Sequence, residues 1–236
     1  MLTLILAGGL GTRLSEETQD RPKPLVEIGG RPIIWHIMMS YYSQGYKDFL
    51  IAGGYKCEML EPTLNKHFVD IPNLKFEVLD TGLHTQTGGR LKRCFEYSGI
   101  QRCFATYGDG VSNINLKELL KVHETSANLV TLTAVHPPAR FGRVVLEDKQ
   151  VIHFGEKNQS DEGWINGGFF VLDRQVIDYI SDDSVSFERF PLSQLAETRK
   201  LGAHLHQGFW QPMDTLREKN ELEEVWKRGK APWKTW

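Results

Sequence analysis

Short apolar segments that end at glycine alternate along the first half of the chain with longer segments of helical spacing. Residues 2–6 form a continuous apolar run, which is typical of a strand buried on both faces. Residues 32–44 predict a helix, and Gly45 follows as a natural C-terminal stop. This order predicts an α/β fold in which a mostly parallel sheet carries helices on both faces. Further strands are predicted at 49–52, 74–79, 103–107 and 130–135, and further helices at 90–97 and 116–126.

The second half of the chain adds elements of a different kind. Residues 143–151 place a polar turn between two β-rich pieces and predict a hairpin. The sequence shows no linker, low-complexity tract or internal repeat, so we expect a single domain over residues 1–236. A small hairpin layer and C-terminal helices would then be added to the sheet. A strand is predicted at 169–172 and helices at 174–180, 190–200 and 216–228.

Composition and charge exclude several classes of protein. The 236 residues are 40% hydrophobic and 25% charged, as in soluble globular proteins. Lys plus Arg number 28 and Asp plus Glu 30, so the net charge of −2 gives no general attraction to nucleic acid or an anionic membrane. Cys57, Cys94 and Cys103 are far apart and predict reduced thiols rather than a disulfide framework or a zinc ribbon. The apolar run at 2–6 is too short for a signal peptide or a membrane span, so we expect a cytoplasmic protein.

The first predicted strand leads directly into a glycine-rich loop, residues 6–14 (LAGGLGTRL). Glycines leave backbone amides open to a ligand, and such a loop at the end of a central strand is a phosphate cradle in α/β folds. Leu14 stands where a dinucleotide fingerprint needs glycine, and the Gly-Lys-Ser/Thr of a Walker loop is absent. Arg13 and Lys23, the latter between two prolines, supply positive charge. The simpler alternative is a tight turn in which Arg13 is a surface charge.

Two aspartates carry different local signals, and the first is a candidate metal ligand. Asp109 lies between glycines directly after an apolar strand, hence at the same sheet edge as the glycine loop. Asp214 precedes Thr215 and a charged helix, so the local sequence favours an N-cap. Asp214 can bind metal only if a neighbour such as Thr215 caps that helix instead.

Other polar motifs have ordinary structural interpretations when taken alone. The pair at 156–157 (EK) reads as solvated surface, and residues 166–168 (NGG) read as a turn. Residues 87–90 (TGGR) resemble a helix N-terminus, which still attracts anions. His204 and His206 lack a partner for a metal site nearby in sequence, and we expect His36 to be a hydrogen-bonded core residue. The tryptophans of the C-terminal tail are expected to pack on the domain or on a neighbouring subunit.

The motifs together resemble the sugar-1-phosphate nucleotidylyltransferases. The glycine loop and Lys23-Pro24 are shared by many members of that family, and the similarity continues along nearly the whole chain. Residues 210–212 and the tail are more typical of the glucose-1-phosphate cytidylyltransferase branch. The matching stretches are 8–14 (GGLGTRL), 23–30 (KPLVEIGG), 34–38 (IWHIM), 87–93 (TGGRLKR), 106–110 (TYGDG), 165–170 (INGGFF), 209–215 (FWQPMDT) and 229–234 (GKAPWK).

This resemblance implies a Rossmann-like three-layer sandwich of the nucleotide-diphospho-sugar transferase type. Residues 1–135 would form the nucleotide-binding half and residues 136–236 the acceptor-binding half. A Mg²⁺ ion would be held by Asp109 and Asp214, and the catalytic cations would be Arg13, Lys23 and Lys157. The implied nucleotide-binding residues are Leu6, Ala7, Gly8, Gly9, Gly11, Thr12, Arg13, Gly88, Gly89, Arg90 and Asp109. The implied acceptor-binding residues are Tyr107, Gly108, Glu156, Lys157, Asn166 and Gly167.

The implied reaction joins CMP from CTP to glucose 1-phosphate and releases pyrophosphate, which makes CDP-glucose for surface-polysaccharide synthesis, in a homo-oligomer. The chain departs from that branch in one respect, because the stretch over residues 70–87 is shorter. The departure keeps other acceptors open, such as L-glutamine phosphate, and the nucleotide could also be dTTP or UTP. A third hypothesis is a nucleotide-sensing module without turnover, but it predicts loss of Asp109, Asp214 or Lys157, and all three are present.

Overall fold

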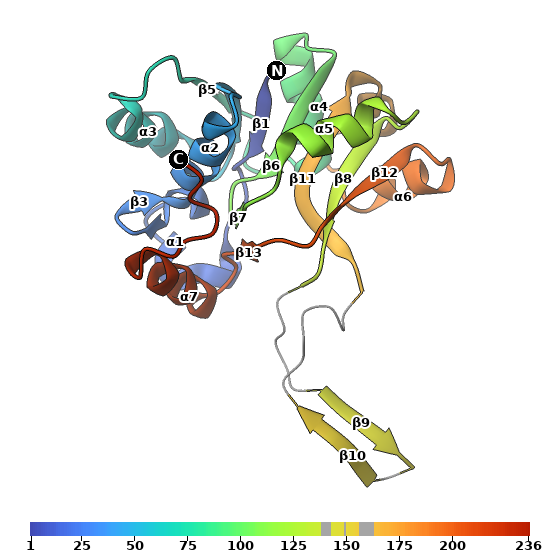
Figure 1. The fold of residues 1–236 in the computed structure, drawn as a ribbon. Helices are drawn as coiled ribbons and strands as arrows, with labels where there is room; N and C mark the ends of the chain where they lie inside the picture. Colours follow the sequence, from blue (N-terminus) through green and yellow to red (C-terminus); the bar gives the residue numbers. More distant parts are fainter. Residues whose placement is uncertain (138–142, 149, 156–162) are drawn as a thin grey trace.

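A seven-stranded sheet forms the centre of the computed structural model, in the order β12-β8-β11-β6-β1-β4-β5 (Figure 1). The structure describes residues 1–137, 143–148, 150–155 and 163–236. β11 runs antiparallel to β6 and β8, whereas the other neighbours in this sheet pair in parallel. The predicted α/β class with a mostly parallel sheet is confirmed. The strands are β1 (Thr3–Leu6), β4 (Asp48–Gly53), β5 (Lys75–Asp80), β6 (Arg102–Tyr107), β8 (Val130–Val135), β11 (Ile165–Asp173) and β12 (Leu201–His206).

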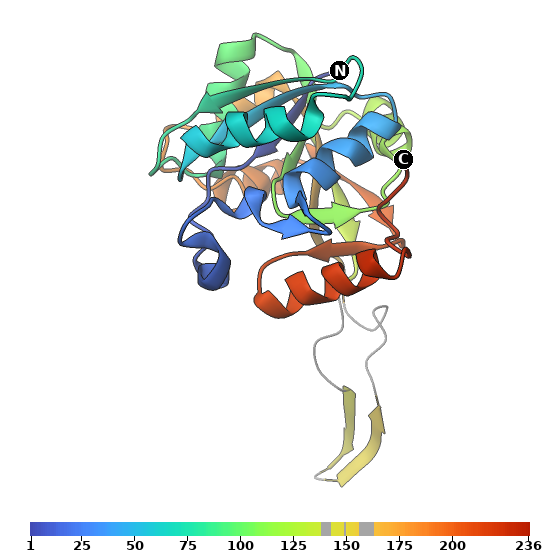
Figure 2. The ribbon, with the colours of Figure 1, turned by 90° about the vertical axis from the view of Figure 1, so that its left-hand side faces the viewer.

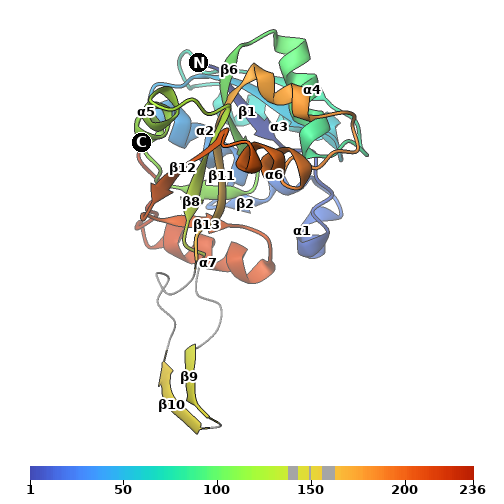
Figure 3. The same cartoon turned by 90° about the vertical axis from the view of Figure 1, so that its right-hand side faces the viewer.

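Helices cover both faces of the sheet, and the interior strand β1 is apolar on both sides. Ile5 of β1 belongs to one buried cluster with α2, α3, α5 and α7, while Leu4 and Leu6 belong to another with α4, η5 and α6. Figures 2 and 3 show the two helical layers from opposite sides. These helices are α2 (Ile33–Ser43), α3 (Leu60–Phe68), α4 (Thr87–Ser98), α5 (Leu116–Glu124), η5 (Arg174–Tyr179), α6 (Phe190–Glu197) and α7 (Leu216–Lys227).

Short elements complete the structure around the sheet. The predicted hairpin is confirmed, since β9 (Arg143–Glu147) and β10 (Gln150–Gly155) pair antiparallel in a sheet of their own. Two more ribbons join β2 (Glu27–Ile28) with β3 (Arg31–Pro32), and β7 (Gly110–Ser112) with β13 (Trp210–Pro212). The remaining short helices are η1 (Thr12–Leu14), α1 (Ser15–Thr18), η2 (Lys23–Leu25) and η3 (Cys57–Met59).

The predicted element boundaries are mostly correct within a few residues. The helix predicted at 174–180 is the 3₁₀ helix η5, and α6 ends at Glu197, three residues before the predicted end. Asn115 is the N-cap of α5, because its side chain accepts from the amides of Lys117 and Glu118. None of the described helices is long and apolar enough to cross a membrane.

The C-terminal tail packs around a buried histidine, as expected from the sequence. His36 is fully buried in α2, bonds the carbonyl of Ile28 at 2.8 Å and lies edge-on to Trp226 at 4.6 Å. Trp233 donates from its indole to His36 at 3.3 Å and stacks on Trp226. Burial lowers the pKa of His36 to about 4, so the ring is neutral at neutral pH. The tail thereby attaches α7 to α2.

Truncation of this cluster should destabilise the fold. Because Trp233 is only 1% exposed, we expect Trp233→Ala to lower the free energy of unfolding by about 3–5 kcal/mol. Urea denaturation followed by circular dichroism measures that value. Trp164→Ala is the matched control, since Trp164 is 41% exposed and should cost under about 1 kcal/mol. Equal losses in the two variants would contradict the packing role of the tail.

Candidate active site

The carboxyl ends of β1 and β6 place the predicted phosphate loop beside the predicted metal ligand. The two strands are parallel neighbours in which Leu6 pairs with Tyr107, and the amide of Gly108 donates to Leu6 at 2.9 Å. The loop after β1 and Asp109 after β6 therefore leave the sheet at one edge. An added Cβ at Gly108 would lie 3.1 Å from the Leu6 carbonyl, so glycine suits this close approach.

The glycine loop presents its backbone to open space. Gly11 has a φ of +65°, in the left-handed region that favours glycine, and it precedes η1. A Cβ at Gly9 would meet no protein atom within 4 Å, so the space beside it is open to a ligand. Within the described part of the chain, the amides from Gly8 to Arg13 donate no hydrogen bond to protein. The loop therefore has the properties of an anion-binding nest.

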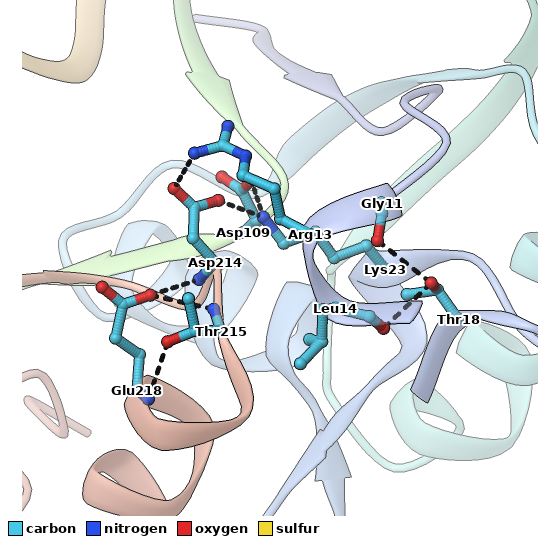
Figure 4. Close-up of polar contacts among 9 residues, drawn as sticks. All are labelled: Gly11, Arg13, Leu14, Thr18, Lys23, Asp109, Asp214, Thr215 and Glu218. Atoms are coloured by element: carbon cyan, nitrogen blue, oxygen red, sulfur yellow. Dashed lines mark hydrogen bonds and ion pairs between the residues drawn. The ribbon is translucent and has the colours of Figure 1, made fainter. Parts of the chain in front are cut away.

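One ammonium group joins the two predicted metal ligands. Lys23 Nζ lies 2.6 Å from Asp109 Oδ2 and 2.6 Å from Asp214 Oδ1 (Figure 4). Arg13 Nη1 donates to the other oxygen of Asp214 at 2.8 Å. The Arg13 side chain is 76% exposed, so its remaining donors are accessible. The structure thus brings together Arg13, Lys23, Asp109 and Asp214, which the sequence analysis selected from three distant segments.

The β7–β13 ribbon brings Asp214 to Asp109. Pro212 pairs with Gly110, and the amide of Met213 donates to the Asp109 carbonyl at 2.8 Å. Thr215, rather than Asp214, caps α7, because its hydroxyl accepts from Glu218 in a capping box. The Asp214 carboxylate is directed at the two cations instead (Figure 4). The condition that the sequence set for a metal-binding Asp214 is therefore met.

Lys23 is a buried cation whose charge is maintained by its neighbours. Its side chain is 11% exposed, and burial acts to lower its pKa. The charges of Asp109 and Asp214, and the hydrogen bonds to them, outweigh that effect, so the pKa of Lys23 is raised from 10.5. Lys23 therefore stays protonated throughout the neutral range.

Two cavities meet at this cluster. One, of about 510 Å³, is lined by the glycine loop, Lys23 and residues 83–87. The other, of about 670 Å³, is lined by Asp214, residues 165–169 and Trp210. Both volumes are in the range of small-molecule sites. The residues that line both cavities are Arg13, Tyr107 and Asp109.

Of the described residues predicted for the acceptor, Tyr107, Asn166 and Gly167 line the second cavity, whereas Gly108 lines the first. The Asn166 amide donates to the Tyr107 hydroxyl at 3.4 Å, and its oxygen accepts from the Gly168 amide at 2.9 Å. The Gly167 carbonyl accepts from the Trp210 indole at 2.7 Å. Residues 156–157, the predicted Glu156 and Lys157, lie outside the described residues, and their roles stay predictions.

Comparisons with known proteins agree with this geometry. The description "Nucleotidyl transferase" names a family whose sequence model matches residues 2–211. This chain belongs to the nucleotidyl transferase family. The chain is 46% identical over 256 residues to the glucose-1-phosphate cytidylyltransferase of Salmonella typhi, and all of both chains is covered. It is 39% identical over 255 residues to a probable glucose-1-phosphate cytidylyltransferase of Bacillus subtilis, again over all of both chains.

These full-length similarities place the nucleotidyl transferase chain in the glucose-1-phosphate cytidylyltransferase branch. The Salmonella alignment has twenty more positions than this chain has residues, in agreement with a shortened segment. Among solved structures, HddC from Yersinia pseudotuberculosis has a TM-score of 0.71 at 24% identity, with 95% of this chain and 99% of that chain covered. That likeness shows the fold, which is the expected nucleotide-diphospho-sugar transferase sandwich.

Three residues of this nucleotidyl transferase that were predicted to approach the nucleotide make close contacts with protein. The Arg90 guanidinium is buried and donates to the carbonyls of Gly53 at 2.6 Å and Gly8 at 3.0 Å, so it supports the glycine loop. An added Cβ at Gly88 or Gly89 would lie 2.6 Å from the backbone of residues 183–185. These glycines therefore permit helix–loop packing, and any contact with the nucleotide stays a prediction.

Sequence analysis missed several residues of the transferase site. Residues 83–86 line the first cavity, and Glu188 lines the second although its segment has no recognisable motif. Among the described residues, no group of three or more His, Cys, Asp or Glu side chains is placed to hold a metal ion. A metal ion held by the predicted ligands Asp109 and Asp214 would therefore need further oxygens from substrate.

Loss of the shared ammonium should destabilise the protein in a pH-dependent way. The pKa of Lys23 is raised on folding, so its stabilising effect is complete below pH 10.5 and is lost as the pH rises through the folded value. We expect Lys23→Met to lower the free energy of unfolding by about 2–3 kcal/mol at pH 7. Denaturant titrations from pH 7 to 11 should show this difference shrinking at the alkaline end.

The matched control is Lys219→Met, which removes the ion pair of Lys219 with Glu17 outside the cavities. Its cost should stay below about 1 kcal/mol. If Lys23→Met and Lys219→Met lower the free energy of unfolding equally, the buried ion pairs of Lys23 contribute no more to stability than an ordinary ion pair.

Proposed function

We propose that this protein transfers CMP from CTP to α-D-glucose 1-phosphate and releases pyrophosphate, which yields CDP-glucose. The observation that carries the proposal is the meeting of two cavities at Arg13, Lys23, Asp109 and Asp214. Nucleotidyl transfer needs two phosphate-bearing substrates at one cationic centre. The arrangement supplies both spaces and the charges between them.

The nucleotide side of the site suits a triphosphate. The glycine-loop amides that donate to no described protein atom, together with the exposed Arg13 guanidinium, are donors that favour phosphate oxygens. Arg90 holds the loop from behind through the Gly8 carbonyl. The loop can therefore bind charge with little reorganisation, which is the condition for electrostatic catalysis.

The paired aspartates suit Mg²⁺. Both Asp109 and Asp214 direct an oxygen at one cationic atom, so two carboxylates already converge on a positive charge. Mg²⁺ binds through one or two carboxylates with substrate phosphates completing the shell. We propose that Asp109 and Asp214 hold it, and when bound it would withdraw charge from the phosphate oxygens around the reacting phosphorus.

For this reaction the protein must align the two substrates and supply positive charge. A phosphate oxygen of the acceptor attacks the α-phosphorus of CTP, and the bond from that phosphorus to the bridging oxygen breaks, so pyrophosphate leaves with the electron pair. Lys23 and Arg13 lie where negative charge accumulates, and the raised pKa keeps Lys23 protonated. We propose that Lys157 binds the phosphate of the acceptor.

The choice of CTP and glucose 1-phosphate rests on the relatives. Proteins that are 46% and 39% identical over their full lengths bear the name glucose-1-phosphate cytidylyltransferase, the second as probable. We propose a cytoplasmic location, which agrees with three free and buried cysteines. We also propose a homo-oligomer that supplies a nucleotide sugar for surface polysaccharide.

A pyrophosphate-release screen tests the substrates. We expect turnover with CTP and glucose 1-phosphate to exceed all other pairs by at least about 100-fold in kcat/KM. The screen crosses CTP, UTP, dTTP, ATP and GTP with glucose 1-phosphate and a panel of other phosphates that includes L-glutamine phosphate. Preference for another pair would replace the proposed substrates, and absence of release with every pair would contradict the enzyme.

Neutralising one carboxylate tests the metal site. Asp109→Asn should lower kcat by at least about 100-fold and weaken Mn²⁺ binding in the presence of CTP, because Asn is a weaker ligand without charge. Electron paramagnetic resonance of Mn²⁺ gives a readout that does not depend on turnover. Asp48→Asn is the control, since Asp48 is exposed at the amino end of β4, away from the site. Normal Mn²⁺ binding by Asp109→Asn would remove the metal role.

A further inference from the structure

The carboxylate of Glu188 lies where the two cavities adjoin. Its Oε1 accepts from the Tyr107 hydroxyl at 2.6 Å, and its Oε2 accepts from Thr87 at 2.6 Å and Ser186 at 2.8 Å. Glu188 lines the second cavity, whereas Thr87 lines the first. One side chain thus connects the end of β6 and the start of α4 through hydrogen bonds.

The Tyr107 hydroxyl has a fixed direction. It donates to Glu188 and accepts from Asn166, so a lone pair rather than the proton remains for a ligand. Its ring lies edge-on to Phe170 at 5.8 Å, and a Cβ at Gly168 would lie 2.3 Å from it. Tyr107 is therefore held in one orientation.

The acceptor side of the second cavity combines this polar pair with an apolar wall. Trp210, Phe169 and Pro212 line the same space, and the Trp210 indole is fixed by its bond to Gly167. A ligand with an apolar ring face and several hydroxyls matches such a surface. A carboxylate among the lining groups accepts hydrogen bonds from hydroxyls and repels a second anionic group on the ligand. A neutral sugar ring meets both conditions.

We propose that Glu188 determines acceptor specificity. Its carboxylate accepts a hydrogen bond from one ring hydroxyl of a sugar 1-phosphate whose sugar ring is uncharged, beside the Tyr107 oxygen that Glu188 orients. The inference rests on the proposed function and adds a specificity residue to it. Three donors from the protein already hold the carboxylate in place, so the sugar hydroxyl meets a preorganised acceptor. An acceptor without that hydroxyl leaves Glu188 unpaired by substrate and is rejected.

A cycle of enzyme variants and substrate analogues tests this role. Wild type and Glu188→Gln are assayed by pyrophosphate release with CTP and glucose 1-phosphate or its 2-, 3-, 4- and 6-deoxy analogues. With the wild type, kcat/KM for one of the deoxy analogues should be about 10- to 100-fold lower than for glucose 1-phosphate, which is the value of a hydrogen bond to a charged group. In Glu188→Gln the loss at that same position should fall to within about 3-fold, while the KM for CTP changes by less than about 2-fold.

Glu77→Gln is the matched control, because Glu77 accepts from the Tyr97 hydroxyl in an equivalent pair on the exposed surface. It should leave the analogue profile unchanged. Tyr107→Phe is a second variant, which should reduce the loss in kcat/KM for the same deoxy analogue. It keeps the test available if thermal melting shows that Glu188→Gln fails to fold.

The outcomes separate the two proposals. The role of Glu188 is overturned, while the enzyme activity stands, by either of two results. One is that the wild type loses the same factor in kcat/KM with every deoxy analogue, and the other is that Glu188→Gln shows the same relative kcat/KM values as the wild type. Absence of wild-type turnover with any sugar 1-phosphate overturns the proposed function and this inference together. A single deoxy position that is flattened in both Glu188→Gln and Tyr107→Phe supports the assignment.

Discussion

The site depends on one ammonium group that two carboxylates share. Lys23 lies 2.6 Å from both Asp109 and Asp214, and these three residues come from segments far apart in the sequence. Two carboxylates directed at one point repel each other unless a cation lies between them. Because the Lys23 side chain is largely buried, its attraction to the two carboxylates is stronger than at the surface. The backbone around Asp109 and Asp214 must therefore bring each carboxylate to the lysine. The site is therefore complete only when the C-terminal segment is packed beside Asp109.

The scaffold that holds Asp214 is formed by the last part of the chain. The β7–β13 ribbon fixes the backbone beside Asp109, and the capping box at Thr215 starts α7 directly afterwards. α7 is attached at its other end, since the Gly29 amide donates to Glu223 at 2.7 Å and Trp226 packs on the same turn. That turn follows η2, which contains Lys23. The segment that follows Lys23 in sequence therefore contacts the helix that follows Asp214, and this contact holds the two ion-pair partners together.

The sequence predicts those parts of the site that local rules control. The glycine endings of β1 and β6 locate the sheet edge, because carboxyl ends of parallel strands lie together. The position of Thr215 three residues before Glu218 is a capping-box signature, so the release of Asp214 from capping could have been predicted as well. Glu188 could not, because its partners Tyr107 and Thr87 are 81 and 101 residues away and its segment has no periodicity. Arg90 illustrates the same limit, since only the folded chain shows that its guanidinium faces backbone carbonyls.

Three consecutive residues at the end of β6 explain why the two cavities act as one site. Tyr107 faces Glu188 on the acceptor side, and Asp109 faces Lys23. Gly108 between them bonds to Leu6 and is tightly surrounded, since an added Cβ would lie 3.2 Å from Pro24. A shift of this strand end would therefore move the Tyr107–Glu188 and Asp109–Lys23 contacts together, while the glycine loop after Leu6 would move with its hydrogen-bonded neighbour. In the proposed reaction, the register of these two parallel strands would then set the relative positions of the two substrates.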